Sequence, residues 1–286
     1  MVVEIKALAC ERPVDLGLPL ARLSTSEIAR VAVAREIVEA ISVTTVWRWL
    51  SEDALKPWRY RSWIFPRDPD FERKAGLVLD LYRGRWQGEP LRPDEHVVCA
   101  DEKTSIQARA RIHPGSPPAP GRAVRVEHEY ERAGALAYFA AWDVHRAQVF
   151  GRCEPRTGIA PFGRRVDQVM AQEPYRSASR VFWVVDNGSS HRGTRCEARL
   201  RERWPQIRVV HTPIHASWLN QVELYFSIVQ RKVLDPNEWC SLAALEAAIL
   251  AFGERYSTIA TPFEWRFTRL DLHRVLAALS PVAQAA

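Results

Sequence analysis

Two short apolar segments of this chain end in an aspartate, and they constrain its fold more than any other feature. They are His96–Asp101 (HVVCAD) and Arg180–Asp186 (RVFWVVD). A continuous apolar run of this length, rich in valine, is typical of a strand buried on both faces of a sheet. Acids at the ends of such strands reach the sheet edge, where α/β folds build their sites. The sequence therefore predicts a buried sheet that exposes both aspartates at an edge.

Further segments predict the rest of an α/β domain. Alternating or apolar patterns predict additional strands at 107–113, 124–130, 135–144, 147–151 and 207–212. Residues 114–122 are rich in proline and glycine and predict a loop, and 131–134 should separate two strands. Helical spacing predicts helices at 70–82, 166–171, 192–204, 219–233 and 242–256. Adjacent strands followed by alternating helices and strands indicate an α/β fold with a mixed sheet.

The N-terminal region has a helical pattern instead. Helices are predicted at 26–40, after a capping Ser24 or Thr25, and at 44–50. The second helix is expected to turn three residues inward, namely Val46, Trp47 and Leu50. Two short helices with a tight join are typical of a helix-turn-helix. Its DNA-facing residues would be Thr44, Thr45 and Arg48. A plain helical hairpin explains the same pattern.

Residues 56–63 (KPWRYRSW) combine basic residues with aromatic rings and contain no acid. This composition suits an arm that lies on a DNA backbone, with Lys56, Arg59 and Arg61 as phosphate contacts. A linker whose tryptophans cover a neighbouring core explains it equally well. The formal net charge of +6 and the sequence pI of about 9.2 permit a polyanionic partner, but many unrelated enzymes share these values.

Cysteine usage and hydropathy exclude several classes of protein. The five cysteines are scattered, odd in number and without CxxC spacing, which argues against a disulfide framework or a zinc site. The start of the chain has no signal-peptide pattern, and no stretch approaches the roughly 18 to 20 apolar residues of a membrane span. We therefore expect a cytoplasmic protein without a membrane partner. No Gly-rich phosphate loop is present either, so nucleotide hydrolysis is not expected.

Glu223 adds a third acid to the two aspartates. It lies one turn into a helix opened by SWLNQVE, on the same face as Asn220. With Asp101 and Asp186 it would form an oxygen cage of the kind that Mg²⁺ and Mn²⁺ prefer. Two such ions, roughly 3.5 to 4 Å apart, would activate a water or a 3′-hydroxyl and stabilise the leaving oxygen of a phosphodiester. From spacing alone, each acid is equally explained as a loop-capping or solvated residue.

Three blocks of the sequence carry a family resemblance. Residues 100–104 (ADEKT), 185–192 (VDNGSSHR) and 211–223 (HTPIHASWLNQVE) are similar to the signature blocks of transposases of the IS630 group, bacterial relatives of the Tc1/mariner elements. Residues 187–222, 36 in number, separate the second aspartate from the glutamate, and this spacing suits that group. The resemblance extends from residue 22 onward, with further similar segments at 45–50, 226–234 and 262–267.

The resemblance implies a DNA transposase of the DDE type. It implies an RNase H-like catalytic domain at 67–286, preceded at 1–66 by a partial helix-turn-helix region and a basic linker. By motif match, Asp101, Asp186 and Glu223 take the metal-ligand roles for two Mg²⁺ or Mn²⁺ ions. The implied reaction cleaves the ends of an insertion element and transfers the 3′-hydroxyls to a TA target in double-stranded DNA. Synapsis of two ends implies a homodimer on DNA, in the bacterial cytoplasm and on the nucleoid.

Three polar residues beside the acids have supporting roles under this interpretation. Asn187 and Asn220 adjoin ligands and would orient them or a bound water, although helix or loop capping explains each of them as well. His191 would contact a phosphate or hold the loop that follows Asp186. A structural role is the alternative for this histidine.

The charged neighbours of the acids have separate expectations. Glu102 should point away from Asp101, because side chains alternate along a strand. Lys103 and Arg192 are expected to contact DNA, with a solvated basic face as the alternative.

One departure from the family pattern concerns the N-terminus, because relatives usually carry two helix-turn-helix units. Residues 1–21 do not resemble a complete unit, so the first unit is expected to be missing and recognition of the terminal repeats to be weaker.

Three alternative functions remain open. The first is a domesticated or truncated DNA-binding remnant without transposition activity. The second is another nuclease of the same fold, such as a junction resolvase or ribonuclease H, against which the SWLNQVE block argues. The third is a transcription regulator, which would leave the acid-tipped strands unexplained.

Overall fold

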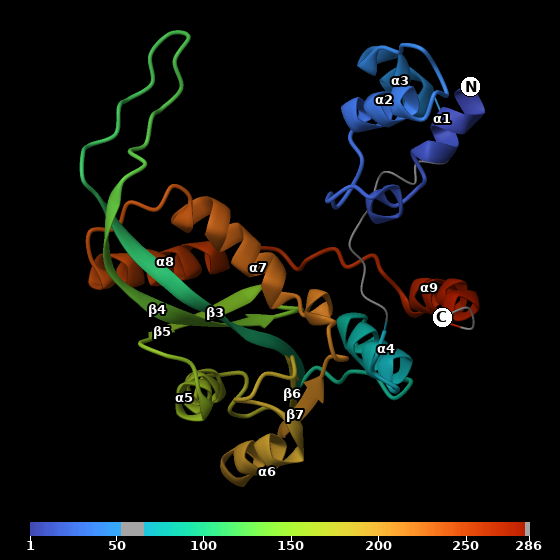
Figure 1. Cartoon of the computed structure of the whole chain (residues 1–286). Helices are drawn as coiled ribbons and strands as arrows, with labels where there is room; N and C mark the ends of the chain where they lie inside the picture. The colour runs from blue at the N-terminus through green and yellow to red at the C-terminus, as the bar shows by residue number, and fades with distance from the viewer. Residues whose placement is uncertain (53–65, 284–286) are drawn as a thin grey trace. The chain divides into compact units, whose positions relative to one another are not determined.

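The computed structural model describes residues 1–52 and 66–283 of the 286-residue chain (Figure 1). The chain divides into two compact units, Met1–Phe65 and Pro66–Ala286. The basic residues Lys56, Arg59 and Arg61, expected to contact DNA, lie outside the described residues. Within the ranges described, no helix has the length and apolar character needed to cross a membrane.

The N-terminal unit is built around a small helical core. Its elements are α1 (Val2–Leu8), the 3₁₀ turn η1 (Pro13–Leu16), α2 (Thr25–Ala34) and α3 (Val43–Ser51). The hydroxyl groups of Ser24 and Ser42 cap α2 and α3, since they accept hydrogen bonds from backbone N–H groups at 3.2 and 3.0 Å. The apolar faces of the three helices meet in a core that contains Ile5, Leu8, Ile28, Ala32, Val46 and Leu50.

Two details of this unit differ from the sequence prediction. The first helix of the predicted pair ends at Ala34 and does not continue to Ala40, because Glu36 has a φ of 57°, outside the helical region. Trp47 does not point inward: it is 61% exposed, whereas Val46 is buried. α1, which packs in the same core, is not predicted by the sequence pattern.

A five-stranded mixed sheet organises the second unit (Figure 1). Its strands are β3 (Glu95–Arg111), β4 (Tyr130–Asp143), β5 (Gln148–Glu154), β6 (Arg180–Val185) and β7 (Ile207–His211). Their order is β5-β4-β3-β6-β7, in which β3, β6 and β7 are parallel and β4 is antiparallel to both of its neighbours. β1 (Arg85–Trp86) and β2 (Glu89–Pro90) pair separately. The prediction of an α/β fold with a mixed sheet is confirmed.

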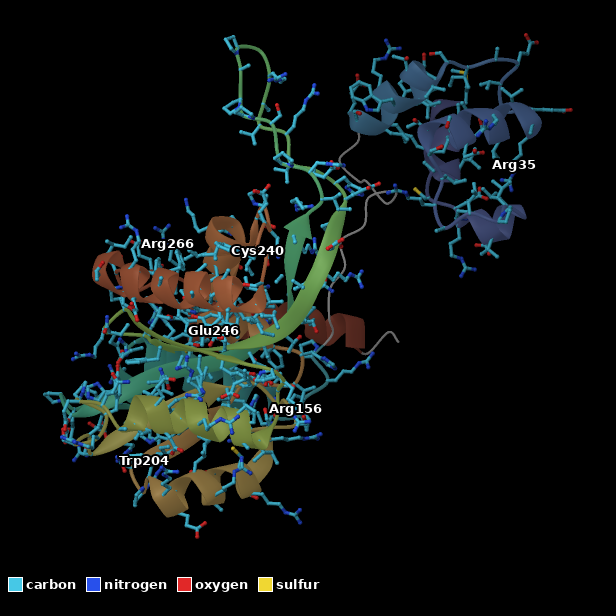
Figure 2. The ribbon with its side chains drawn as sticks, turned by 90° about the vertical axis from the view of Figure 1, so that its left-hand side faces the viewer. Arg35, Arg156, Trp204, Cys240, Glu246 and Arg266 are labelled. Atoms are coloured by element: carbon cyan, nitrogen blue, oxygen red, sulfur yellow. The ribbon has the colours of Figure 1, made fainter. Side chains whose placement is uncertain are left out.

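Helices cover both faces of the sheet. α5 (Ile159–Met170) and α6 (Gly193–Arg203) pack on one face, and α4 (Phe71–Tyr82), α7 (Val222–Val229) and α8 (Leu242–Ile259) pack on the other. Because side chains alternate along β3, Cys99 joins the core with α4, α7 and α8, whereas Ala100 joins the core with α5 and α6. Figure 2 shows these layers, with Glu246 of α8 on one side of the sheet and Trp204 of the α6 end on the other.

The long β3–β4 hairpin differs from the predicted strands. β3 is one continuous strand where two are predicted, and β4 runs through residues 131–134, which were expected to separate strands. The pairing of β3 with β4 shifts register twice, between Lys103 and Ile106 and between Gln107 and Arg109. The two strands therefore stay paired, although side chains no longer alternate regularly between the two faces of the sheet. The predicted strand 124–130 does not form apart from Tyr130, and residues 112–129 form a loop that projects from the sheet (Figure 1).

The predicted helix 219–233 is divided into three pieces. They are the 3₁₀ turn η2 (Ser217–Leu219), α7 and the π-helical turn η3 (Gln230–Leu234). The break between η2 and α7 occurs at Asn220, whose ψ of 111° is extended because its side chain binds the neighbouring strand. A last helix, α9 (Arg269–Ala283), is not predicted and joins α4 through an ion pair between Arg269 and Asp80 at 2.7 Å.

Candidate active site

The parallel pairing of β3 with β6 brings Asp101 and Asp186 to the same level. Cys99 on β3 pairs with Val184 on β6, and each aspartate follows two residues later. Because the two strands run in the same direction, both carboxylates are placed at the carboxyl edge of the parallel strands. The two acid-tipped segments of the sequence therefore meet in space.

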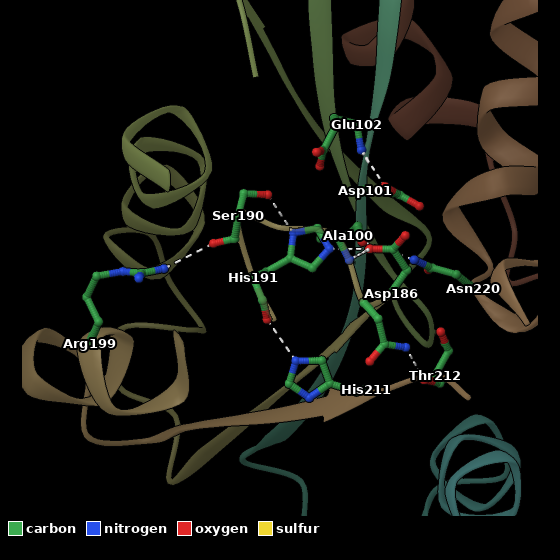
Figure 3. A network of polar contacts seen from close by, with 12 residues as sticks. Ala100, Asp101, Glu102, Asp186, Ser190, His191, Arg199, His211, Thr212 and Asn220 are labelled. Atoms are coloured by element: carbon green, nitrogen blue, oxygen red, sulfur yellow. Dashed lines mark hydrogen bonds and ion pairs between the residues drawn. The ribbon is translucent and has the colours of Figure 1, made fainter. Parts of the chain in front are cut away.

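Asn220 attaches the segment of the third acid to this edge. Its buried Nδ2 donates a hydrogen bond to the carbonyl oxygen of Ala100 at 3.0 Å, next to the first aspartate (Figure 3). The backbone N–H of Gln221 donates to the hydroxyl group of Tyr82 at 3.3 Å. These two contacts hold the start of α7 against β3, and Glu223 lies in the first turn of the helix.

The three acids are electrostatically coupled. Burial, followed by the negative charges of Asp186, Glu102 and Glu223, raises the pKa of Asp101 to about 7. Burial and the charge of Asp186 also raise the pKa of Glu223. The pKa of Asp186 is lowered, chiefly because its carboxylate has a hydrogen bond with His191. Asp101 and Glu223 therefore ionise reluctantly beside the ionised Asp186, and a cation bound here would stabilise their charged forms.

His191 holds Asp186 in position. Its buried Nε2 forms a hydrogen bond with Asp186 Oδ1, and the backbone N–H of Gly188 donates to the same oxygen at 2.7 Å (Figure 3). Ser190 Oγ lies 3.0 Å from His191 Nδ1, and His211 Nε2 lies 2.8 Å from the His191 carbonyl oxygen. Both ring nitrogens of His191 therefore have partners, which determines the orientation of the ring.

Glycine at position 188 makes this arrangement possible. A Cβ atom there would lie 2.9 Å from the His191 ring and 3.0 Å from Asp186 Oδ1. Burial opposes protonation of His191, but the hydrogen bond and charge of Asp186, with the charges of Glu102 and Asp101, outweigh it and raise the histidine pKa. The neighbouring carboxylates thus favour the protonated form of this imidazole.

The donor set fits a hard divalent cation. Carboxylate oxygens are the ligands that Mg²⁺ and Mn²⁺ prefer. The raised pKa values of Asp101 and Glu223 reflect burial first and then the neighbouring negative charge, which a cation would relieve. Glu102 Oε2 is buried and has no hydrogen-bond partner in the described part of the chain. As the side chains stand, no three His, Cys, Asp or Glu residues of that part are grouped closely enough to hold one metal ion.

A cavity of about 380 Å³ opens beside Asp186. Asn187, Gly188 and Arg192 line one side, and the loop 212–217 after β7 lines the other. Asn187 Nδ2 donates a hydrogen bond to a carbonyl oxygen of that loop at 2.8 Å, so it joins the two walls. Arg192, which is exposed, adds a positive charge to the lining of this cavity.

The sequence-predicted residues fall into two separate groups. Asp101, Asp186 and Glu223 are coupled at one edge of the second unit, together with the three supporting residues Asn187, His191 and Asn220. Lys103 is half-buried near them, and its charge opposes the raised pKa of Glu223. The N-terminal unit holds the other predicted group, in which Thr44 and Arg48 are exposed and Thr45 is half-buried.

Several residues around the acids are absent from the sequence prediction. Glu102 points away from Asp101, as predicted, and lies on the side of Ser190 and His191 (Figure 3). Ser190 and His211 themselves are not predicted as site residues, although both lie in the family blocks, which is the signal that identifies them. Tyr82 has no such signal, since it belongs to a helix far away in the sequence.

The contact between His191 and Asp186 leads to a testable expectation. In the metal-dependent DNA cleavage that the sequence blocks imply, His191→Gln should reduce the rate by roughly 10- to 100-fold and raise the metal concentration needed for half-maximal rate, because an outer partner of a ligand sets its orientation. Nicking assays over a metal titration measure both quantities. The exposed His273 of α9 provides the control His273→Gln. If both variants respond alike, His191 has no positioning role.

The fold has a counterpart among solved structures. The crystal structure of the mariner Mos1 paired end complex with Mg is similar with a TM-score of 0.53 and 14% identity, over 93% of this chain and 74% of that one. The predicted RNase H-like fold class is confirmed. A Shigella sonnei protein described as "Insertion element IS630 uncharacterized 39 kDa protein" is 22% identical over 260 residues, which are 88% of this chain and 70% of that protein.

The sequence also matches a family of nucleases. Residues 96–246, more than half of the chain, match the family described as DDE superfamily endonuclease, and this span contains Asp101, Asp186 and Glu223. The chain therefore belongs to the DDE superfamily endonucleases. With the IS630 relative and the mariner-like fold, this match confirms the resemblance to IS630-group and Tc1/mariner transposases that the sequence blocks indicate.

Proposed function

We propose that this protein is a DNA transposase that cuts the ends of an insertion element and joins them to a target duplex. The observation that carries the proposal is the coupling of Asp101, Asp186 and Glu223 at one edge of the sheet. Membership in an endonuclease family supports it. The coupled carboxylates are the catalytic groups of this proposal, and their substrate is a phosphodiester of double-stranded DNA.

The residues around the carboxylates have defined tasks in this mechanism. When bound, two Mg²⁺ or Mn²⁺ ions at Asp101, Asp186 and Glu223 would activate the attacking water or 3′-hydroxyl and stabilise the leaving oxygen. Asn220 keeps the start of α7 against β3 and so keeps Glu223 near Asp101. His191 orients Asp186. The similar Mos1 structure is a paired end complex with Mg, which supports a divalent cation here.

The proposed partners follow from the reaction. Element terminal repeats and a TA target are the DNA substrates, and a homodimer would hold two ends at once. The helix-turn-helix would present Thr44, Thr45 and Arg48 to the DNA, and the basic linker and Lys103 would contact its backbone. We further propose that the protein acts in the bacterial cytoplasm, on the nucleoid.

The test is cleavage of a labelled duplex that carries the terminal repeat flanking the coding sequence. The duplex is incubated with the protein in Mg²⁺, in Mn²⁺ or in EDTA, beside an Asp186→Asn variant. We expect nicking at the repeat boundary in either metal, and none in EDTA or with the variant. A matched duplex with a scrambled repeat controls for nonspecific nicking.

Other outcomes decide between the alternatives. Binding of the repeat without cleavage by the unsubstituted protein would favour a domesticated or truncated DNA-binding remnant. Cleavage that persists in EDTA or in the Asp186→Asn variant would show that the carboxylates are not the catalytic groups.

A further inference from the structure

A second cavity lies along the free part of strand β3. Beyond Cys99, β3 leaves β6 and continues with β4 alone towards the projecting 112–129 loop (Figure 1). Its open edge, from Lys103 to Arg111, borders a cavity of about 300 Å³ whose other wall is formed by residues 230–237, which follow α7. This groove, lined by residues 103–111 and 230–237, begins two residues after Asp101.

The far wall is attached to the strand in a way that keeps the groove open. Asn237 Nδ2 donates a hydrogen bond to the carbonyl oxygen of Gln107 at 2.7 Å, and Asn237 Oδ1 accepts one from the backbone N–H of Arg109 at 3.3 Å. One asparagine side chain thus replaces the missing strand neighbour at a single point. The groove is therefore a defined feature of the fold.

The charge of the groove is positive and largely uncompensated. Its lining contains the basic residues Lys103, Arg109 and Arg111, and none of them has a carboxylate at ion-pair distance within the described ranges. The acid in the lining is Asp235, whose Oδ1 accepts a hydrogen bond from Gln230 Nε2 at 3.0 Å. Three cations against one acid make a surface that attracts an anion.

The fold satisfies only part of this positive charge: Arg111 Nη1 donates hydrogen bonds to the carbonyl oxygens of Glu127 and His128 at 2.7 and 3.4 Å. Arg109 pairs directly opposite Arg132 on β4, and like charges at facing positions destabilise a sheet. Arg109 and Arg111 both hold their guanidinium groups over the ring of Tyr130, at 4.7 and 5.4 Å from its centroid. Their Nε atoms are buried without a hydrogen-bond partner among the described residues, which also costs stability. A bound polyanion would offset the repulsion between Arg109 and Arg132.

We propose that this groove binds the sugar-phosphate backbone of DNA that enters or leaves the active site. The edge from Lys103 to Arg111 spans about 25 Å at roughly 3.3 Å per residue, enough for several consecutive phosphates. Lys103 connects the groove to the carboxylates, since it lines the groove and lies two residues after Asp101. The inference rests on the proposed function, because the bound strand is the substrate of that site.

The first test measures how salt weakens binding of a fluorescein-labelled duplex of arbitrary sequence in EDTA. The groove variant is Arg109→Gln/Arg111→Gln, and the control Arg201→Gln/Arg255→Gln removes equal charge from exposed positions on α6 and α8. The slope of log K against log[NaCl] should become shallower by about 1 to 2 in the groove variant and stay unchanged in the control. Equal slopes in the two variants would overturn the proposal.

A purely structural role for the two arginines makes a different prediction. If they only brace the hairpin on Tyr130, the groove variant should melt at a lower temperature and keep its salt slope, which would overturn the proposal. If they bind DNA, the salt slope should become shallower whether or not the melting temperature changes, because the substitutions remove phosphate contacts as well as the contacts with Tyr130.

A second pair of variants leaves the arginines in place. Thr104→Glu adds a negative charge at an exposed position of the groove, and Thr258→Glu adds one at an exposed position on α8. The first should weaken duplex binding several-fold and the second should not. Equal affinities would contradict DNA binding in the groove.

Nicking by the unsubstituted protein, measured alongside, separates this inference from the proposed function. If the unsubstituted protein nicks DNA in a metal-dependent way but the groove variant keeps its salt slope, DNA binding in the groove is overturned and the transposase proposal stands. If the slope of the groove variant is shallower but the unsubstituted protein does not nick DNA, DNA binding in the groove is supported and the proposed transposase reaction is contradicted. Titrations with a terminal-repeat duplex and a TA-containing target duplex then assign the occupant, since the loss of affinity should concentrate on one of them. If the groove variant loses affinity for neither duplex, the proposal that the groove binds DNA is overturned.

Discussion

Asp101→Asn and Glu223→Gln are each expected to lower the rate of metal-dependent cleavage by about a thousandfold or more. Each amide keeps the size of the side chain but removes the negative charge, and cation stabilisation of a phosphoryl transition state is worth several kcal/mol. A loss of about 1.4 kcal/mol corresponds to a factor of ten in rate. Single-turnover nicking of the labelled terminal-repeat duplex measures the effect directly.

The matched control for these variants is Glu202→Gln, which removes one charge from an exposed position on α6. It should cleave at the rate of the unsubstituted protein. All three variants should bind the duplex in EDTA, because the DNA-contacting residues are unchanged. An Asp101→Asn or Glu223→Gln protein that cuts as fast as this control would exclude that acid from the catalytic set.

In EDTA at about pH 8, Asp101→Asn should raise the free energy of unfolding by on the order of 2 kcal/mol, after allowance for partial solvent screening. The pKa of Asp101 is about 7 in the folded chain, against about 3.9 for an unperturbed aspartate. The folded state therefore binds more protons than the unfolded state between these values, and stability falls as the pH rises through this range. The amide removes a charge that folding places among other acids.

The dependence of this stability gain on pH and on metal tests whether it comes from removing the Asp101 charge. Below about pH 4 the carboxyl group is protonated in both states, so the advantage of Asp101→Asn should disappear. Mg²⁺ should reverse the order, since saturation at one hundred times Kd stabilises a binding protein by about 2.7 kcal/mol. Chemical denaturation at several pH values, with and without Mg²⁺, provides the comparison. A variant less stable than the unsubstituted chain in EDTA at high pH would show that Asp101 is not destabilised in the fold.

The sequence pattern predicts the sheet and its acids because their signals are local. The runs 96–101 and 180–186 are too apolar and too short for anything but buried strands, and parallel pairing then places Asp101 and Asp186 at one edge. Glu223 is found through its block, since SWLNQVE identifies the family while a single helical acid identifies nothing. Residues 96–246 match the endonuclease family for the same reason.

Local patterns fail where a distant contact decides the backbone. The alternation at 124–130 predicts a strand, yet the long hairpin pairs residues 130–143 with β3 and leaves 112–129 as a loop. The helical pattern at 219–233 is interrupted at Asn220, whose backbone is extended and whose side chain donates a hydrogen bond to the carbonyl oxygen of Ala100. In the N-terminal unit, burial of Val46 against α1 and α2 leaves Trp47 on the outside.

What the sequence by itself determines here is therefore the class of fold and the family, and it proposes the three acids as the site, since strand length, apolar runs and motif blocks depend on consecutive residues. Only the tertiary structure decides how Asp186 is held, because the contact with His191 depends on the missing Cβ of Gly188 and on the partners of the imidazole. It alone also places Arg109 and Arg111 beside the 230–237 segment. Basic residues of one strand become the wall of a groove when that strand continues beyond its neighbour and a segment far away in the sequence packs opposite, and no local pattern records where that neighbour ends.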